Sequence, residues 1–321
     1  MVFENIAGFN DPDDILLVER KSMANPVYAD VANLIRDEFS TSFLDNVQKQ
    51  STALSAFTRV NMGTREATMP VVATQPEAKF VGYGDADRTK PTSGLGFKNK
   101  NIFASEIAVI VPVKEEDIAD ANADIVGQII RQGSEAVART LDAAVLLGIG
   151  KPAEWADKSV FEAATAAGNI FQLSNKQDLP GAILKGAEAL DVAGNNPDRI
   201  IARRGLGFSL ANTRNANGSP IYVPSLNQAT GQAGEIMGIP YFKDEIGSLD
   251  RKKAEALIVD SSKVIIGVRQ DLTVKMLDQA TVGGISLAEN DMVAFRFVMR
   301  AGYVLSDMLG APAAAITPAT A

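Results

Sequence analysis

Two aspartates in a polar stretch are the first residues of this sequence that could do chemistry. Asp85 and Asp87 are two positions apart in "GYGDADRTK", followed by Arg88 and Lys90. Paired carboxylates can divide general acid and base roles when burial separates their acidities. The residues around this pair are not apolar enough to bury it. We therefore interpret Asp85 and Asp87 as exposed.

Three other motifs resemble binding loops, and each lacks a residue that its pattern requires. In "GIGKP", Pro152 stands where a phosphate loop needs Ser or Thr. In "RRGLGFSL", Leu210 replaces the third glycine of the dinucleotide fingerprint. In "DPDDILL", Leu16 stands where a calcium loop needs glycine. We predict a helix stop, an ordinary loop and a solvated turn at these places, with no cofactor, no metal site and no catalytic residue.

The chain of 321 residues contains no His and no Cys. Disulfides and thiolate zinc sites are therefore excluded, as is any Ser–His or Cys–His catalytic pair. The net charge of -8 argues against a basic face that grips DNA phosphates, although it is compatible with enclosing DNA. An enzyme that works through Lys or Asp remains an alternative.

The hydrophobic fraction is 46% and the mean hydropathy is +0.03, which is typical of a globular chain of about two domains. No apolar run approaches the roughly 18 residues of a membrane span. The N-terminus has no basic stretch ahead of an apolar core, so we expect no signal peptide. We expect a soluble protein, cytoplasmic or associated with a virion.

The polar stretch lies between two extended runs. Residues 65–75 come before it, and after it Ile107, Val109, Val111 and Val113 alternate on one face. The intervening residues far exceed the roughly two to five of a usual hairpin loop. This pattern predicts a long hairpin, whose aromatic side chains would stay exposed unless a partner covers them. These aromatic residues are Phe80, Tyr83 and Phe97.

Helical and extended patterns surround this hairpin. Apolar spacing predicts a helix over 28–47 and a second over 113–147, with one break near 121–124. The second would be about 50 Å long, which suits the spine of an elongated molecule. Helices and strands then alternate from 178 to 270 as in a separate α/β domain. "LTVKML", "DMVAFRFVMRAGYVL" and "AAAIT" predict strands of one terminal sheet.

This order of elements resembles the major capsid protein family of tailed bacteriophages, which has the Hong Kong 97 fold. The resemblance depends on "TMPVVATQPEAKFVGYGDADRTKPTS", "SEIAVIVPVKEEDIADA", "LDAAVLLGIGKP" and "GEIMGIPYFKD" with "ALIVDSSKVIIGVRQDLTVKM" after it. It implies an α+β fold with an N-terminal arm, an extended β-hairpin loop, a peripheral domain with a long spine helix, and an axial domain. The implied bounds are 1–52 for the arm and its helix, 68–111 for the loop, 53–67, 112–176 and 271–321 for the peripheral domain, and 177–270 for the axial domain.

The resemblance implies a structural protein rather than an enzyme. Such a protein self-assembles as hexamers and pentamers into the icosahedral shell, first the prohead and then the mature head, around double-stranded DNA. The implied location is the virion, with assembly in the host cytoplasm. The extended loop of this family lies over a neighbouring subunit. The residues that would make this contact here are Phe80, Tyr83, Asp85, Asp87, Arg88, Lys90, Phe97, Lys98 and Lys100.

Two departures from the family limit what the resemblance implies. Some members join subunits by a Lys–Asn isopeptide bond promoted by a buried Glu, but "DMVAFRFVMRAGYVL" contains no Glu. We therefore predict no crosslink, although Lys79 and three other hairpin lysines are available. The match begins within about fifty residues of Met1, so we expect a separate scaffolding protein. A portal and, where the shell has one, a decoration protein are further partners. An encapsulin shell, which encloses cargo enzymes, remains an alternative.

Overall fold

The computed structural model describes residues 51–81, 90, 92–120, 124–174, 178–214, 234–306 and 310–318. Contacts divide the chain into Met1–Ser42 and Phe43–Ala321, and every described residue belongs to the second unit. The arm and the helix predicted for residues 1–50 therefore lie outside the described residues. The second unit contains two larger sheets with their helices and one long hairpin, which is an α+β fold.

A four-stranded sheet has the order β1-β10-β13-β4. Its central strands β10 (Val264–Leu277) and β13 (Met292–Leu305) are 14 residues long and antiparallel. The edge strands are β1 (Thr58–Asn61), parallel to β10, and β4 (Ser105–Lys114), antiparallel to β13. Strand β4 alternates half-buried and exposed side chains along its whole length, which confirms the predicted alternation from Ile107 to Val113.

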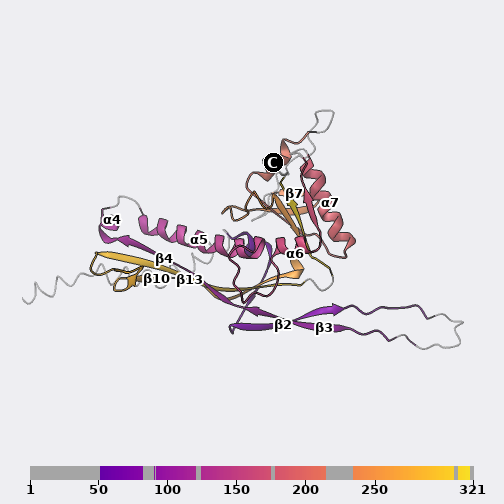
Figure 1. Cartoon of the computed structure of the whole chain (residues 1–321), viewed down its shortest axis with the longest axis horizontal. Coiled ribbons are helices and arrows are strands. Elements are labelled where there is room, and N and C mark those ends of the chain that lie inside the picture. Colours follow the sequence, from indigo (N-terminus) through magenta and orange to yellow (C-terminus); the bar gives the residue numbers. More distant parts are fainter. Residues whose placement is uncertain are drawn as a thin grey trace, which may run out of the picture. The chain divides into compact units, whose positions relative to one another are not determined.

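Helix α5 (Ile125–Leu147) lies along this sheet (Figure 1). Asp124 caps its first turn, which was not predicted. Gly148, in the left-handed region at φ 71°, ends the helix, and this stop confirms the prediction. The predicted start at Val113 is wrong because the alternating β-branched residues continue β4 to Lys114, and a short helix α4 (Glu115–Ala119) follows. With 23 residues, α5 is about 35 Å long rather than about 50 Å.

A six-stranded sheet has the order β5-β14-β9-β6-β8-β7. In that order its strands are Ile170–Gln172, Ala313–Thr317, Ala256–Val259, Arg199–Ala202, Ile239–Lys243 and Gly234–Ile236. Helices α6 (Val160–Ala166), α7 (Leu179–Val192) and α8 (Leu206–Ala211) accompany it, and a cluster of fully buried side chains from α7, α8 and the sheet forms its core.

Strand β14 corrects one prediction. The sequence placed Ala313–Thr317 in one sheet with Met292–Leu305, but β14 pairs with β9 and β5 instead. Its small, fully buried alanines fit beneath α7 and α6, and local pattern does not encode that choice of partner. Strand β10 also begins at Val264, within the segment predicted as axial, after a 3-10 turn at Ser261–Lys263. The domain division itself stays a prediction.

Strands β2 (Glu66–Thr74) and β3 (Gly96–Phe103) form a separate two-stranded ribbon, which runs away from the four-stranded sheet in Figure 1. Its pairing ends at Glu66 opposite Phe103, so Ser105–Val111, predicted as part of the extended loop, belongs to β4. Two small elements complete the part of the fold that the structure describes: helix α3 (Thr52–Ala56), and the hairpin of β11 (Thr281–Val282) and β12 (Ile285–Ser286).

Candidate assembly surfaces

The root of the hairpin packs on the four-stranded sheet. Ile102 of β3 is buried with Met62, Ala104 and Val304, and Ala67 and Met69 of β2 pack against this cluster. Two glycines make the approach possible, and the first is Gly267, where a Cβ would lie 2.4 Å from Met62 Sδ. A Cβ on Gly302 would lie 2.6 Å from Ile102 and 2.7 Å from the Phe103 carbonyl oxygen, so no larger residue fits there without a shift. The root is therefore a fixed part of the fold.

Beyond the root, the hairpin exposes apolar side chains. Phe80 is 106% exposed and Phe97 is 62% exposed, although large apolar side chains usually find cover. Lys90 and Lys98 are also exposed. The other predicted contact residues Tyr83, Asp85, Asp87 and Arg88 lie outside the described residues. The ribbon thus presents two aromatic rings and two lysines that its own chain does not cover.

Lys100 does not belong to that exposed group. Its Nζ lies 2.8 Å from Asp157 Oδ1, and the two side chains are only 12% and 18% exposed. The same ammonium donates to the carbonyl oxygen of Leu305. Lys100 therefore binds within its own chain, and its ammonium is not available to a neighbour.

The segment between α5 and α6, residues 148–159, holds the hairpin root. Trp155 is 4% exposed, and its Nε1 donates to the Phe103 carbonyl oxygen over 3.0 Å. Its ring lies 5.9 Å from that of Tyr303, whose hydroxyl donates to the carbonyl oxygen of Lys158. Glu154 accepts from Ser105 and pairs with Arg65. The sequence placed Trp155 in the core, and the structure gives it this additional hydrogen bond.

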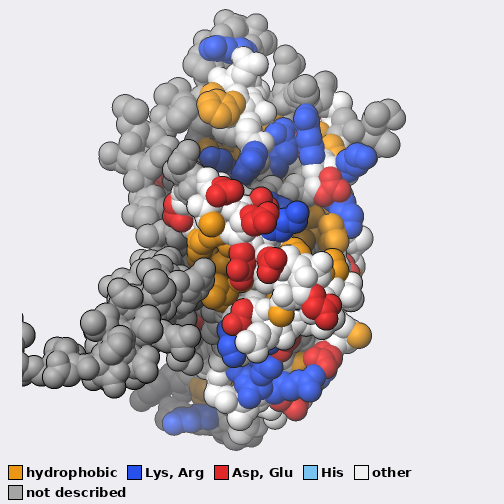
Figure 2. All heavy atoms as spheres, turned by 90° about the vertical axis from the view of Figure 1, so that its left-hand side faces the viewer, with side chains coloured by type: hydrophobic (Ala, Val, Ile, Leu, Met, Phe, Trp, Pro, Cys, Tyr) orange, Lys and Arg blue, Asp and Glu red, His pale blue; other side chains and the backbone are white. Residues whose placement is uncertain are grey.

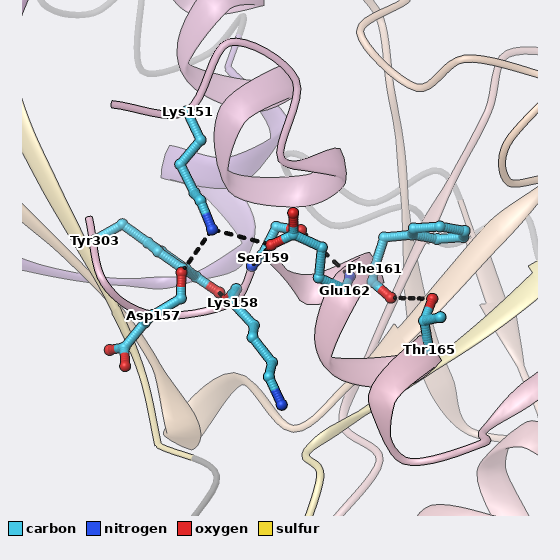
Figure 3. A network of polar contacts seen from close by, with 8 residues as sticks. All are labelled: Lys151, Asp157, Lys158, Ser159, Phe161, Glu162, Thr165 and Tyr303. Atoms are coloured by element: carbon cyan, nitrogen blue, oxygen red, sulfur yellow. Dashed lines mark hydrogen bonds and ion pairs between the residues drawn. The ribbon is translucent and has the colours of Figure 1, made fainter. Parts of the chain in front are cut away.

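Figure 3 shows how this segment is itself ordered. Lys151 donates to the main-chain oxygen of Asp157 over 2.9 Å and to Glu162 Oε2 over 3.0 Å. Ser159 and Glu162 form a reciprocal capping box at the start of α6. Burial raises the pKa of Glu162, but the hydrogen bonds from the Ser159 amide and Lys151 outweigh it, and the net pKa lies below its usual value. "GIGKP" is thus a helix stop followed by a structural ion pair.

The two faces of the four-stranded sheet are covered differently. Phe297 faces α5, where its ring would lie 2.3 Å from a Cβ on Gly133. Gly302 is five residues further along β13, so it faces the other side, where the hairpin root packs. On this second face, away from the root, Ala108, Ile110 and Pro112 of β4 are exposed; Ile110 is 40% exposed and pairs with Arg296. The sheet therefore has an uncovered face, defined here by the three β4 residues and Arg296.

On the α5 side, an open apolar groove of about 390 Å³ lies between α5 and β4. It is lined by Val109, Val111, Ile125, Gln128, Ile129, Gln132, Gly133 and Ala136. The N-terminal half of the predicted apolar stripe lines this groove, whereas Leu141, Ala144 and Val145 are buried. No titratable side chain lines the groove, so it offers no acid–base chemistry.

Helix α3 joins α5 through a buried carboxylate. Asp142, 0% exposed, accepts from Ser51 Oγ over 2.6 Å and from the amides of Thr52 and Ala53 over 2.9 and 3.1 Å. Burial raises the pKa of Asp142 to about 7, the three donors oppose the rise, and Asp244 adds to it. The sequence analysis missed this site. The sequence does contain a signal for it, because Asp142 follows Leu141 among the apolar residues of the predicted helix, where a carboxylate must be buried.

The end of the molecule near α4 carries both acidic and basic side chains. Figure 2 shows acidic side chains gathered in the middle of this face, with apolar side chains beside them and Lys and Arg above and below. Glu115, Glu116 and Asp117 form the first turn of α4.

In the described part of the chain, no three His, Cys, Asp or Glu side chains lie close enough together to hold a metal ion. Among the described residues, no helix has both the length and the hydrophobicity of a membrane span.

Comparison with known proteins identifies the family. The model of the phage capsid family matches residues 31–310. A solved structure from Mycobacterium phage Bobi is 40% identical, with a TM-score of 0.73 over 85% of this chain and 92% of that one. One from Mycobacterium phage Adephagia is 39% identical, with a TM-score of 0.73 over 91% and 98% of the two chains.

A more distant structure, the capsid of an empty GTA particle, is 16% identical with a TM-score of 0.57 over 84% of this chain and 90% of that one, which shows a shared fold alone. No curated protein matches the chain. The family match covers most of the sequence and includes the four-stranded sheet, α5, the hairpin and all described strands of the six-stranded sheet except β14. The chain therefore belongs to the phage capsid family, with the Hong Kong 97-type fold, and is a structural protein of the virion.

Proposed function

We propose that this chain is the major capsid protein that self-assembles as hexamers and pentamers into the icosahedral prohead and mature head of a tailed phage, around double-stranded DNA. The proposal includes the division into N-terminal arm, extended loop, peripheral domain and axial domain. Assembly in the host cytoplasm, with a scaffolding protein, a portal and, where the shell has one, a decoration protein, completes it.

One observation carries the proposal: the hairpin and the uncovered face lie on the same side of the four-stranded sheet. Helix α5 covers the opposite side at Phe297, while the hairpin root covers only the Gly302 end of this side. Ile110 and its neighbours on β4 remain open. In a ring of copies related by rotation, the same side of each sheet faces in the same direction. The hairpin of one copy can therefore cover the open part of the sheet of the next copy.

The chemistry of the two surfaces supports this contact. The hairpin supplies the aromatic rings of Phe80 and Phe97, and the uncovered face supplies the apolar side chains of β4. Burying such exposed apolar area stabilises an interface by about 25 cal/mol per Å² before the costs of association. Lys90, Lys98 and the residues beyond the described part, Tyr83, Asp85, Asp87 and Arg88, stay in the proposed contact. Lys100 does not, because Asp157 binds it.

The experiment removes the distal hairpin. The unaltered chain and a variant in which a short turn replaces residues 82–94 are expressed, alone and with a scaffolding protein, and examined by negative-stain microscopy. We expect closed shells from the unaltered chain only. The variant should give a folded, unassembled protein with an unchanged circular dichroism spectrum. Normal shells from the variant, or a stable monomer of the unaltered chain under every assembly condition, would refute the proposal.

A further inference from the structure

In the described part of the chain, Lys100 holds the hairpin to the body of the molecule beyond its apolar root. Side chains at alternate positions of β3 face the body of the molecule. Ile102 is 2% exposed, and the Lys100 side chain is 12% exposed, whereas Lys98 is exposed. Lys100 is thus the last inward-facing side chain that the chain covers before the ribbon leaves the body.

Lys100 joins three separate parts of the fold. Its ammonium pairs with Asp157 Oδ1 at 2.8 Å and donates to the Leu305 carbonyl oxygen. The other oxygen of Asp157 accepts from the Leu305 amide over 3.1 Å. These three residues, called the clasp below, connect β3 to the end of β13 and to the segment after α5. Because the pair is largely buried, loss of one partner leaves the other without its opposite charge, which costs more than loss of an exposed ion pair.

The position of Asp157 depends in turn on two helices. Its main-chain oxygen accepts from Lys151, which follows the Gly148 stop of α5 by three residues (Figure 3). Lys151 also pairs with Glu162 in the first turn of α6. A shift of the C-terminal end of α5 would therefore move Lys151 and Asp157, and through them the point where the hairpin leaves the chain.

We propose that the clasp of Lys100, Asp157 and Leu305 sets the direction of the hairpin and couples that direction to the C-terminal end of α5. Lys100 and Asp157 are then positioning residues for shell assembly and make no contact with the next copy. This inference rests on the proposed function, because the direction of the ribbon matters only if it must meet a second copy. A hairpin held at its apolar root alone would pivot about Ile102.

The test compares Lys100→Met and Asp157→Asn with Lys98→Met, a control two residues away on the same strand. Amide hydrogen exchange is measured on the unassembled chains. We expect residues 96–100 to exchange about 10-fold faster in the two clasp variants and at the wild-type rate in Lys98→Met. The double variant should exchange no faster than either single one, because both changes break the same contact. Lys100→Arg, which keeps the charge, should retain most of the protection.

Shell geometry provides the second measurement. Clasp variants should form open or irregular shells. Ile102→Val weakens the root without touching the clasp, so its shells should stay regular and only their yield should fall. Regular shells of wild-type diameter from both clasp variants, unchanged exchange at residues 96–100, or equally fast exchange at these residues in unassembled Lys98→Met would overturn the inference. If the unaltered chain forms no shell, the proposed function fails, and the exchange rates alone still decide whether the clasp holds the hairpin.

Discussion

Asp142 and Ser51 are 91 residues apart in sequence, and a hydrogen bond of 2.6 Å joins their side chains inside the protein. Ser51 immediately precedes α3, and its hydroxyl also accepts from the amide of Leu54. The carboxylate of Asp142 thus fixes the first turn of α3 to the C-terminal third of α5. Because α3 also contacts β6 and β8, this buried group lies where the helix of one sheet meets the strands of the other.

Asp142 should make stability depend on pH. Burial raises its pKa from 3.8 to about 7, so the folded chain holds a proton that the unfolded chain has released. This stability is complete below about pH 4 and is lost as pH rises through about 7, by up to about 1.4 kcal/mol per pH unit. We expect urea unfolding at pH 5 to 8 to show this decline in the wild type and a flatter profile in Asp142→Asn.

The control is Asp124→Asn, which alters the exposed carboxylate that caps the same helix. We expect its profile to run parallel to that of the wild type across this range, since the change leaves Asp142 and its three hydrogen-bond donors in place. If wild type and Asp142→Asn gave parallel profiles, Asp142 would have to titrate outside this range, and the pH argument would fail.

Glu162 should act in the opposite direction. Its pKa lies below the ordinary 4.5, so the stability it adds is present above that pH and is lost as pH falls through the lowered value. We expect Glu162→Gln to be less stable than wild type at pH 7, with the difference shrinking as the pH falls below the ordinary 4.5 and through the lowered pKa. Ser159→Ala, which removes the other half of the capping box, should cost about 1 kcal/mol at pH 7. Equal stability of Glu162→Gln and wild type at pH 7 would contradict a role for this box.

Replacing each of two helical glycines by alanine should change the stability of the chain in opposite directions. A Cβ on Gly133 would lie 2.3 Å from the ring of Phe297, whereas one on Gly181 meets nothing within 4 Å. Gly133→Ala should therefore destabilise the chain by about 1–3 kcal/mol through overpacking of α5 on the sheet. Gly181→Ala should stabilise it by roughly 0.5–1 kcal/mol because alanine favours the helix. Thermal unfolding measures both, and a neutral Gly133→Ala would mean that α5 packs less closely than described.

Features with a local cause could be predicted from the sequence. Alternating β-branched residues indicated β4, the spacing of apolar residues indicated α5, and Gly148 marked its end. The excess of polar chain between two extended runs indicated a hairpin. These signals depend on backbone preference and periodicity, which neighbouring residues decide.

Features that depend on distant partners could not be predicted. Strand β14 has the same pattern of small apolar residues whichever sheet it joins, and only its burial between β9 and β5 decides. Lys100 looks like any hairpin lysine until Asp157, 57 residues later, is placed beside it. For the same reason, the sequence counted Lys100 among the contacts with a neighbour, whereas the structure places it in the clasp with Asp157 and Leu305.

The exposed aromatic rings of the hairpin should affect assembly without affecting folding. Phe80 and Phe97 make little contact with their own chain, so the double change to Ser should alter the free energy of unfolding by less than about 0.5 kcal/mol. Shell yield, measured by sedimentation, should fall steeply because the proposed interface loses its apolar anchors. Phe208→Ser is the matched control, since Phe208 is 85% exposed on α8, outside that interface. An equal loss of shells from the control would show that the hairpin rings have no special role.

The hairpin should hold its neighbour without a covalent bond. A Lys–Asn isopeptide bond needs a free amine and a buried Glu beside it, but β13 contains no Glu from Met292 to Leu305. Asp157 already binds the ammonium of Lys100, so the exposed Lys79, Lys90 and Lys98 are the hairpin lysines left to supply an amine, and β13 offers them no Glu. Boiled, denatured particles should therefore run as one band near 34.0 kDa. A ladder of multimers would contradict this, and changing each exposed lysine to Arg would then identify the reacting amine by the loss of the ladder.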